Sequence, residues 1–123
     1  MGQTNFDIVG ANLVIAPVQH PVELEAANGA INLKAGVAVI TKTGSLAAMT
    51  LAAPTAGTDD GKMLVIVAAT AFAHTVTNAS PGFNNAGASG DVATFGGAIG
   101  DSMQVVAYNG RWHVVSLRNV TLA

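Results

Sequence analysis

The side chains that could do chemistry are few in this chain and lie far apart. The carboxylates are Asp7, Glu23, Glu25, Asp59, Asp60, Asp91 and Asp101. Asp59 and Asp60 precede Gly61 and an apolar run, a position where aspartate accepts backbone hydrogen bonds in a turn, so we interpret them as turn residues and not as an acid/base pair. Asp91 and Asp101 flank a Gly-Gly pair and could approach each other. Turn roles are favoured for both, with a weak surface cation site as the alternative.

The three histidines do not form a recognisable metal or catalytic pattern. His20, His74 and His113 show neither H-x-H nor H-x-x-x-H spacing. We interpret them as half-buried strand residues, with a histidine trio assembled from distant strands as the alternative. The sequence holds no Gly-x-Ser-x-Gly elbow, and the glycine-rich stretch 96–100 lacks the Lys-Ser/Thr of a phosphate-binding loop. We therefore predict that the chain is not an enzyme and holds no cofactor and no resident metal.

The composition points to surface that a partner covers. Only 10% of the 123 residues are charged, against about 25% in a typical soluble domain, while 50% are hydrophobic. Charged surface normally keeps a protein soluble, so low charge with high apolar content favours association. A surface rich in Thr, Asn, Ser and Gly is the alternative explanation. The chain has no cysteine, and its five Lys and Arg are scattered, which argues against nucleic acid as a partner.

Targeting signals are not apparent either. The start of the chain has neither a basic segment nor an apolar segment of the kind that makes up a signal peptide. The longest apolar run, residues 63–69, is far too short to cross a bilayer. We expect a soluble protein without a membrane partner that is not secreted by the ordinary route.

Short β-like runs separated by turn residues fill the chain from residue 23 onward. The expected strands are residues 30–33, 37–41, 47–51, 62–68, 72–77, 92–95, 102–108 and 111–117. Regular short strands with Gly or Asn between them are typical of a sandwich or barrel. We therefore predict one all-β domain over residues 23–123, a small antiparallel β-sandwich or barrel of jelly-roll type.

The last hairpin can be predicted in detail. Asn109-Gly110 favours a two-residue type I′ turn, because both positions tolerate positive φ. Pairing across this turn sets Tyr108 opposite Arg111 and Ala107 opposite Trp112. One face then forms the core, and it consists of Met103, Val105, Ala107, Trp112 and Val114. The other face is mixed and is expected to lie beside solvent or a partner.

Two further segments suggest contacts with partners. Residues 62–68 are apolar on both faces, which indicates a central strand whose second face is covered by another subunit. Residues 78–91 form a long polar loop of the kind that often makes contacts, with Phe83 as its anchor.

The first 22 residues differ from the rest. They contain Pro17 and Pro21 and short apolar pieces, so we predict an extended N-terminal arm over residues 1–22 that reaches a neighbour. An ordinary first strand or a frayed end is the alternative. The candidate partner-contact residues of the chain are Phe6, Ile8, Val14, Ile15, Val18 and Phe83.

The order of motifs resembles small β modules of tailed bacteriophages, which occur in capsid decoration (cement) proteins and at the ends of head or tail fibres. The motifs span about three quarters of the chain. They are Gly36–Lys42, Thr50–Thr55, Asp60-Gly61-Lys62, His74–Thr77, Ala93–Gly97, Asp101-Ser102-Met103 and Ala107–Val114 with its Asn-Gly turn followed by Arg-Trp. The resemblance implies a homotrimer and implies no catalytic residues. No shaft repeat precedes the module, which favours decoration over a fibre.

The expected function is therefore structural. The chain would bind the major capsid protein of a phage head as a trimer and stabilise the shell, so it would be found on the capsid surface after synthesis in the host cytoplasm. The alternative is a receptor- or glycan-binding tip of a head or tail fibre. Tyr108, Arg111 and His113, which share one hairpin face, could supply such a site.

Overall fold

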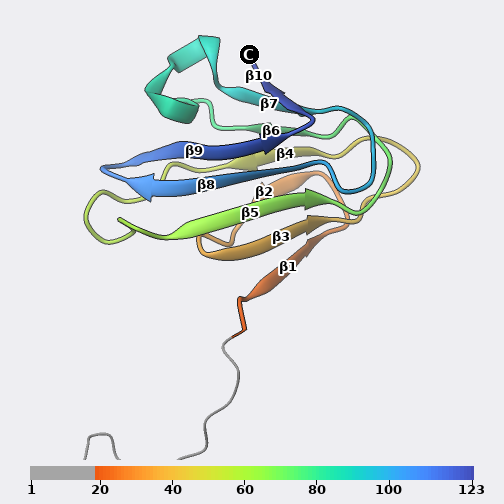
Figure 1. The fold of residues 1–123 in the computed structure, drawn as a ribbon, viewed down its shortest axis with the longest axis horizontal. Coiled ribbons are helices and arrows are strands. Elements are labelled where there is room, and N and C mark those ends of the chain that lie inside the picture. Colours follow the sequence, from red (N-terminus) through yellow and green to blue (C-terminus); the bar gives the residue numbers. More distant parts are fainter. Residues whose placement is uncertain (1–18) are drawn as a thin grey trace, which may run out of the picture.

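Two five-stranded sheets packed face to face make up the described part of the protein (Figure 1). The structure is a computed structural model that describes residues 19–123. The first sheet has the strand order β1-β3-β5-β8-β9 and the second the order β10-β7-β6-β4-β2. The strands are β1 (Val22–Glu25), β2 (Gly29–Ile31), β3 (Gly36–Ile40), β4 (Ala48–Leu51), β5 (Met63–Ala68), β6 (Thr75–Thr77), β7 (Val92–Phe95), β8 (Ser102–Tyr108), β9 (Arg111–Arg118) and β10 (Val120–Leu122). The predicted all-β sandwich is confirmed.

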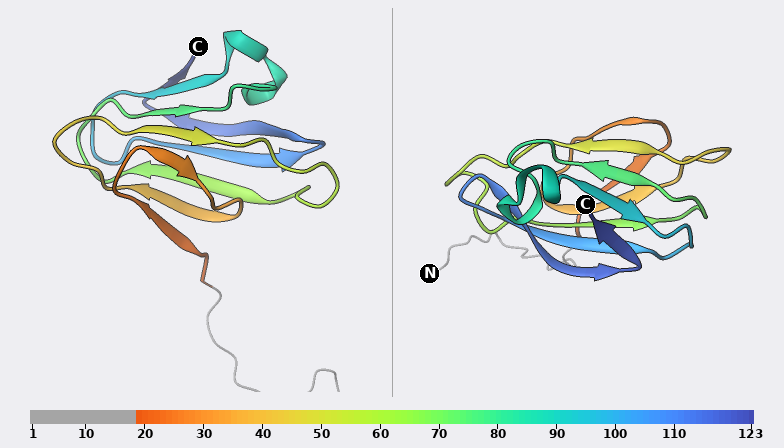
Figure 2. Two further views of the ribbon diagram at one scale, coloured as in Figure 1. Left: turned by 180° about the vertical axis from the view of Figure 1, so that it is seen from behind. Right: turned by 90° about the horizontal axis from the view of Figure 1, so that it is seen from above.

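The first six strands alternate between the sheets. β1, β3 and β5 lie side by side in the first sheet, and β2, β4 and β6 lie side by side in the second, which faces the viewer in the left panel of Figure 2. All pairs within these two sets are parallel, and every pair made by β7, β8, β9 or β10 is antiparallel. The chain thus makes three two-strand rungs, β1–β2, β3–β4 and β5–β6, before antiparallel strands complete both sheets.

The sheets are therefore mixed, and the purely antiparallel, jelly-roll pattern predicted from the sequence is corrected. The reason lies in the connections. A parallel neighbour needs a crossover, which is commonly a helix. Here the crossover is a short strand of the opposite sheet. A succession of short strands with turn residues between them is therefore compatible with both purely antiparallel and mixed sheets.

One core fills the space between the sheets. Inward positions alternate with outward ones along β3, β5, β7 and β8. Across β3, β5 and β8, Ala38 pairs with Ile66, which pairs with Met103, so that buried side chains stand in line on the inner face. The largest fully buried hydrophobic side chains are Trp112, Phe83, Phe95, Ile40, Met49, Leu64, Ile66 and Met103.

The last hairpin has the predicted register. Tyr108 pairs with Arg111 and Ala107 with Trp112, and Asn109 and Gly110 both have positive φ (52° and 77°). The register shifts by one residue between Val105, which pairs with Val114, and Gln104, which pairs with Ser116. The core face contains all five predicted side chains, four fully buried and Val114 packed partly exposed against the core.

The structure differs from the prediction in four places. The predicted strand 72–77 is shorter and starts at Thr75. β10 was not predicted. The polar loop contains two 3-10 turns, Phe83–Asn85 and Gly87–Ser89, visible beside the C-terminus in Figure 1. β1 starts inside the predicted arm, at Val22, and the carbonyl of Pro21 already accepts a hydrogen bond from the Val37 N–H (2.9 Å).

Trp112→Ala should lower the free energy of unfolding by about 3–5 kcal/mol, because it leaves a large cavity in the core. The ring is fully buried, and its Nε1 donates a hydrogen bond to the Ala52 carbonyl (2.9 Å). Chemical denaturation of the two proteins measures the difference. His113→Ala, one residue away on the half-buried outer face, is the control and should cost much less. A larger loss for His113→Ala would mean that the two faces have been exchanged.

Candidate assembly surface

The outer side of β1, β3 and β5 carries only apolar residues in its two central rows. In register, Val22 lies beside Val37 and Val37 beside Val65, while Leu24 lies beside Val39 and Val39 beside Val67. We call these six residues the valine face. Because parallel pairing without a shift repeats the same inward and outward pattern on every strand, the rungs place like side chains next to each other on the surface.

This apolar surface is accessible in the single chain. Val22 and Leu24 are 61% and 65% exposed, and the four valines of β3 and β5 are partly exposed. Next to them on β5, Met63 is 44% exposed. The strand predicted from residues 62–68 is thus central in its sheet, with one face in the core and the other uncovered by the described residues.

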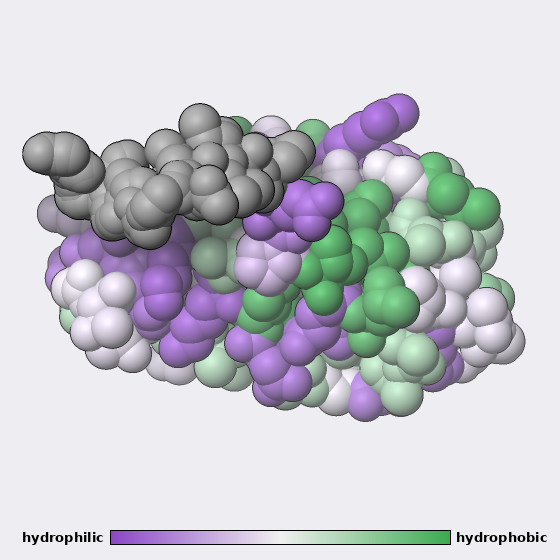
Figure 3. All heavy atoms as spheres, turned by 90° about the horizontal axis from the view of Figure 1, so that it is seen from below, coloured by the Kyte–Doolittle hydropathy of each residue, from purple (hydrophilic) through white to green (hydrophobic). Residues whose placement is uncertain are grey.

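Polar residues replace apolar ones where the rows continue onto β8 and β9. The Val22 row reaches Gln104 and Ser116, and the Leu24 row reaches Ser102 and Arg118. Figure 3 looks onto the β1 edge of the sandwich and shows that hydrophobic residues are exposed there beside hydrophilic ones. An apolar centre with a polar rim is the anatomy of a protein–protein interface.

The predicted partner-contact residues fall into two groups. Phe6, Ile8, Val14, Ile15 and Val18 lie outside the described residues. Phe83 anchors its loop as predicted, but its side chain is fully buried in the core of its own chain. A side chain without exposed surface cannot contact a partner, so the prediction of Phe83 as a contact residue is corrected. The sequence did not predict the valine face as a whole. It predicted only the part on residues 62–68, which are apolar on both faces.

The three side chains proposed for a glycan site lie together near the tip of the β8–β9 hairpin. Tyr108 is 62% exposed, and its ring centroid lies 6.4 Å from that of His113. Arg111 is partly buried, and its guanidinium Nη1 donates to the Asn109 carbonyl (3.3 Å). The cluster therefore offers one exposed aromatic ring.

The other polar side chains predicted for turns and strands are used to hold the fold. Asp59 accepts hydrogen bonds from the Thr55 N–H (2.7 Å), Lys62 Nζ (2.8 Å) and Lys34 Nζ (3.2 Å). These donors, Lys62 first, hold the pKa of its carboxyl well below the usual value. Asp101 accepts from the Ala98 N–H, and the resulting stabilisation of its charged form lowers its pKa. The predicted turn roles of both are confirmed.

His74 is fully buried and not half-buried as predicted. Its Nδ1 accepts a hydrogen bond from the Ala47 N–H (2.9 Å), and its Nε2 lies 3.2 Å from the Thr70 carbonyl. These contacts assign the neutral tautomer with the proton on Nε2. Burial lowers the pKa of the ring, because the charged form would lose its water. The residue joins two loops and is closed to ligands.

Glu23 and Glu25 form a carboxyl pair on the inner side of β1. Glu23 Oε1 accepts hydrogen bonds from the N–H groups of Asn32 (2.9 Å) and Leu33 (3.4 Å). Burial by itself would raise the pKa of Glu23, but hydrogen bonds from Glu25 and from this backbone lower it. Glu25 is buried and its Oε2 has no partner among the described residues. Burial, and then the neighbouring Glu23, raise the pKa of Glu25 to about 7.

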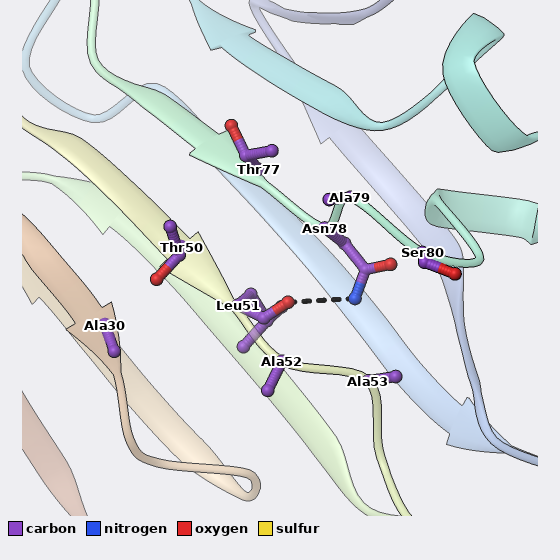
Figure 4. Close-up of a pocket in the computed structure, with 9 residues that line it drawn as sticks. All are labelled: Ala30, Thr50, Leu51, Ala52, Ala53, Thr77, Asn78, Ala79 and Ser80. Carbon is purple, nitrogen blue, oxygen red and sulfur yellow. Dashed lines mark hydrogen bonds between the residues drawn. The ribbon is translucent and has the colours of Figure 1, made fainter.

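A hollow on the outside of the second sheet carries no comparable chemistry. It lies at the ends of β2, β4 and β6 and is lined mostly by alanine, threonine and serine (Figure 4). Its amide side chain, Asn78, is buried and already committed, since Nδ2 donates to the Leu51 carbonyl (2.8 Å) and Oδ1 accepts from the Gly82 N–H (2.9 Å). Within residues 19–123, no three His, Asp or Glu side chains gather in a way that could hold a metal ion.

No helix in the described range is long and apolar enough to span a membrane. Neither a family model nor a curated protein matches the chain. The geometry of the valine face is therefore the main structural observation on function.

Glu25→Gln should make the protein more stable above pH 7 and should flatten part of its pH dependence. The folded state holds the Glu25 proton up to about pH 7, whereas the unfolded chain releases it near the ordinary glutamate pKa of 4.5. Stability from this group is thus fully present below pH 4.5 and is lost as the pH rises through 7, by about 1–3 kcal/mol. The uncharged amide cannot show this loss.

The measurement is urea denaturation of both proteins at several pH values. The difference between their free energies of unfolding isolates Glu25, because the contributions of the other titratable groups cancel. Glu23→Gln is the matched control, because it removes the neighbouring charge and should lower the pKa of Glu25. A difference that stays constant from pH 4.5 to 8 would show that Glu25 is not buried as described.

Proposed function

We propose that the chain is a structural virion protein, a capsid decoration protein that assembles as a homotrimer and clamps the shell of a tailed-phage head. The observation that carries the proposal is the valine face. Exposed apolar surface of this kind, rimmed by polar residues, marks an interaction site in soluble proteins. The resemblance of the motifs to phage decoration modules supplies the kind of particle.

The valine face suits contacts between copies. In a cyclic trimer each chain can turn the same flat face toward the common axis, so that three β1-β3-β5 surfaces meet. Burying these side chains is favourable by about 25 cal/mol for each Å² of apolar surface removed from water. The half-covered valines of β3 and β5 would then become core residues of the assembly.

The arm suits contact with the shell. Phe6 and Ile8 stand near the start of the chain, more than ten residues before β1, so they can reach beyond the sandwich. Three arms on one trimer would bind three shell subunits, and effective concentration would turn weak single contacts into tight binding.

A charge in the valine face should separate the copies. Val37→Lys places an ammonium group between Val22 and Val65, where association would have to remove it from water. We expect the wild-type chain to have three times the mass of one chain in light scattering, and the variant to dissociate at low micromolar concentration. The control is Thr94→Lys, at a similarly part-exposed position on the outside of the second sheet. A Val37→Lys variant that stays trimeric would rule out this face as the interface.

Removing residues 1–18 should abolish binding to the shell and leave the sandwich folded. The truncated chain begins at Gln19 and keeps β1 and the hydrogen bond from the Val37 N–H to the Pro21 carbonyl. The measurement is co-sedimentation with phage particles that lack the native protein, together with the melting temperature. Normal binding of the truncated chain would contradict the role of the arm.

A receptor- or glycan-binding tip is the second candidate, favoured by the exposed Tyr108 beside His113. Aromatic rings at exposed tips can stack on sugars. Tyr108→Ala would then abolish binding to host cells or their surface glycans while binding to particles stays unchanged. The decoration protein would show the opposite pattern, with particle binding lost on truncation and no effect of Tyr108→Ala.

A further inference from the structure

Each sheet has two edge strands, and these lie in pairs at the two ends of the sandwich. At one end, the antiparallel strands β9 and β10 are the last strands of the two sheets. At the other end, β1 and β2 are the edge strands, and no described residue pairs with their free sides. Stacked rungs generally need a cap at each end, because the last rung otherwise exposes backbone groups and apolar side chains.

The free side of β1 has the groups that pair with another strand. The carbonyls of Pro21 and Glu25 face β3, since they accept hydrogen bonds from the N–H groups of Val37 (2.9 Å) and Thr41 (3.0 Å). Successive residues of a strand direct their backbone groups to opposite sides, so the N–H and C=O of Val22 and Leu24 face the open edge. These are also the two most exposed residues of the valine face.

The free edge of β1 could pair with the N-terminal segment of its own chain or with that of a second copy, and the direction in which the chain enters β1 favours the second copy. Gln19, His20 and Pro21 are exposed, and in Figure 1 this short coloured segment leads away from the sandwich and not along its edge. Gly36 fixes this direction, because a Cβ at that position would lie 2.3 Å from the Pro21 carbonyl oxygen. Because the Pro21 carbonyl is held beside Gly36 and the Val37 N–H, only residues 17–20 could turn the chain back, and Pro17 limits the conformations of this short piece.

We propose that the open edge of β1 binds the N-terminal segment of a second copy of this chain, with residues 13–16 (Leu-Val-Ile-Ala) added as a strand beside Val22–Glu25. The inference rests on the proposed self-assembly and names the surface and the segment through which neighbouring copies are joined. The five residues between this segment and β1 span at most about 18 Å when extended, so the strand addition requires the β1 edges of two copies to lie within that distance. The addition continues the apolar rows of the valine face by one strand.

The inner side of β1 limits this addition to a single strand. Glu23 and Glu25 point inward at the edge, and inward charges on an edge strand oppose open-ended strand pairing. An apolar segment can therefore extend the outer face but cannot continue the core into another rung. The two apolar pieces of the arm then have different roles, since residues 13–16 join copies and Phe6 and Ile8 remain free for the shell.

Disulfide trapping between different chains tests the proposal, because the natural chain has no cysteine. One set of chains carries Val22→Cys or Leu24→Cys, and the other carries Val14→Cys or Ile15→Cys together with an affinity tag, so that mixed dimers have their own mass. Two adjacent arm positions are needed because neighbouring residues of a strand point to opposite faces. Paired strands bring the Cα atoms within the distance that a disulfide allows.

We expect mixed, disulfide-linked dimers in at least one of the four combinations after the chains are refolded together and oxidised. Chains with Thr94→Cys, on the other sheet, should give none with the arm variants. No mixed dimer in any combination would overturn the inference, and so would a Leu24→Cys/Ile15→Cys double variant that closes only within one chain.

The same samples separate this inference from the proposed function. If the chains still form trimers and bind particles without any mixed dimer, the strand addition is wrong and the decoration function stands. If the wild-type chain is a monomer that does not bind particles, both are wrong.

Discussion

The parallel, in-register pairing of β1, β3 and β5 is the constraint on which the other features depend. Because the register advances without a shift, each inner residue stands beside an inner residue of the next rung, and each outer residue beside an outer one. The inner set makes the core, with Ala38 next to Ile66 and Ile40 next to Ala68. The outer set makes the valine face. One pairing rule thus accounts for both the stability of the single chain and the apolar surface that it offers.

The side chains capable of acid–base or ligand chemistry support this arrangement instead of forming a site. His74 and Asn78 are buried between strands and satisfy loop backbone, and Asp59 and Asp101 satisfy turns. Irregular connections between rungs leave backbone N–H and C=O groups without ladder partners, and buried groups of this kind need hydrogen bonds. The carboxyl pair at Glu23 and Glu25 is the exception, since the buried Glu25 destabilises the fold at neutral pH and the pair lies on the edge strand β1.

Local signals in the sequence were sufficient for most strands and for the last hairpin, but not for the short strands β1 and β10. Asn109-Gly110 determined the turn, and the register of Trp112 followed from it. Strand partners could not be predicted in the same way, because the alternation of β1 to β6 between two sheets depends on contacts that are distant in sequence. For the same reason, the valine face was visible only in part, through the two-faced run 62–68. Phe83 was correctly recognised as an anchor, but its burial depends on how the loop folds back over the sheet.

A cryo-electron-microscopy map of the native assembly tests the central claim most directly. We expect three copies around one axis, with the β1-β3-β5 surface of each turned toward a neighbouring copy and its valines removed from solvent. A map in which Val37, Val39, Val65 and Val67 face water, with the copies joined through the second sheet or through the β8–β9 hairpin, would contradict it.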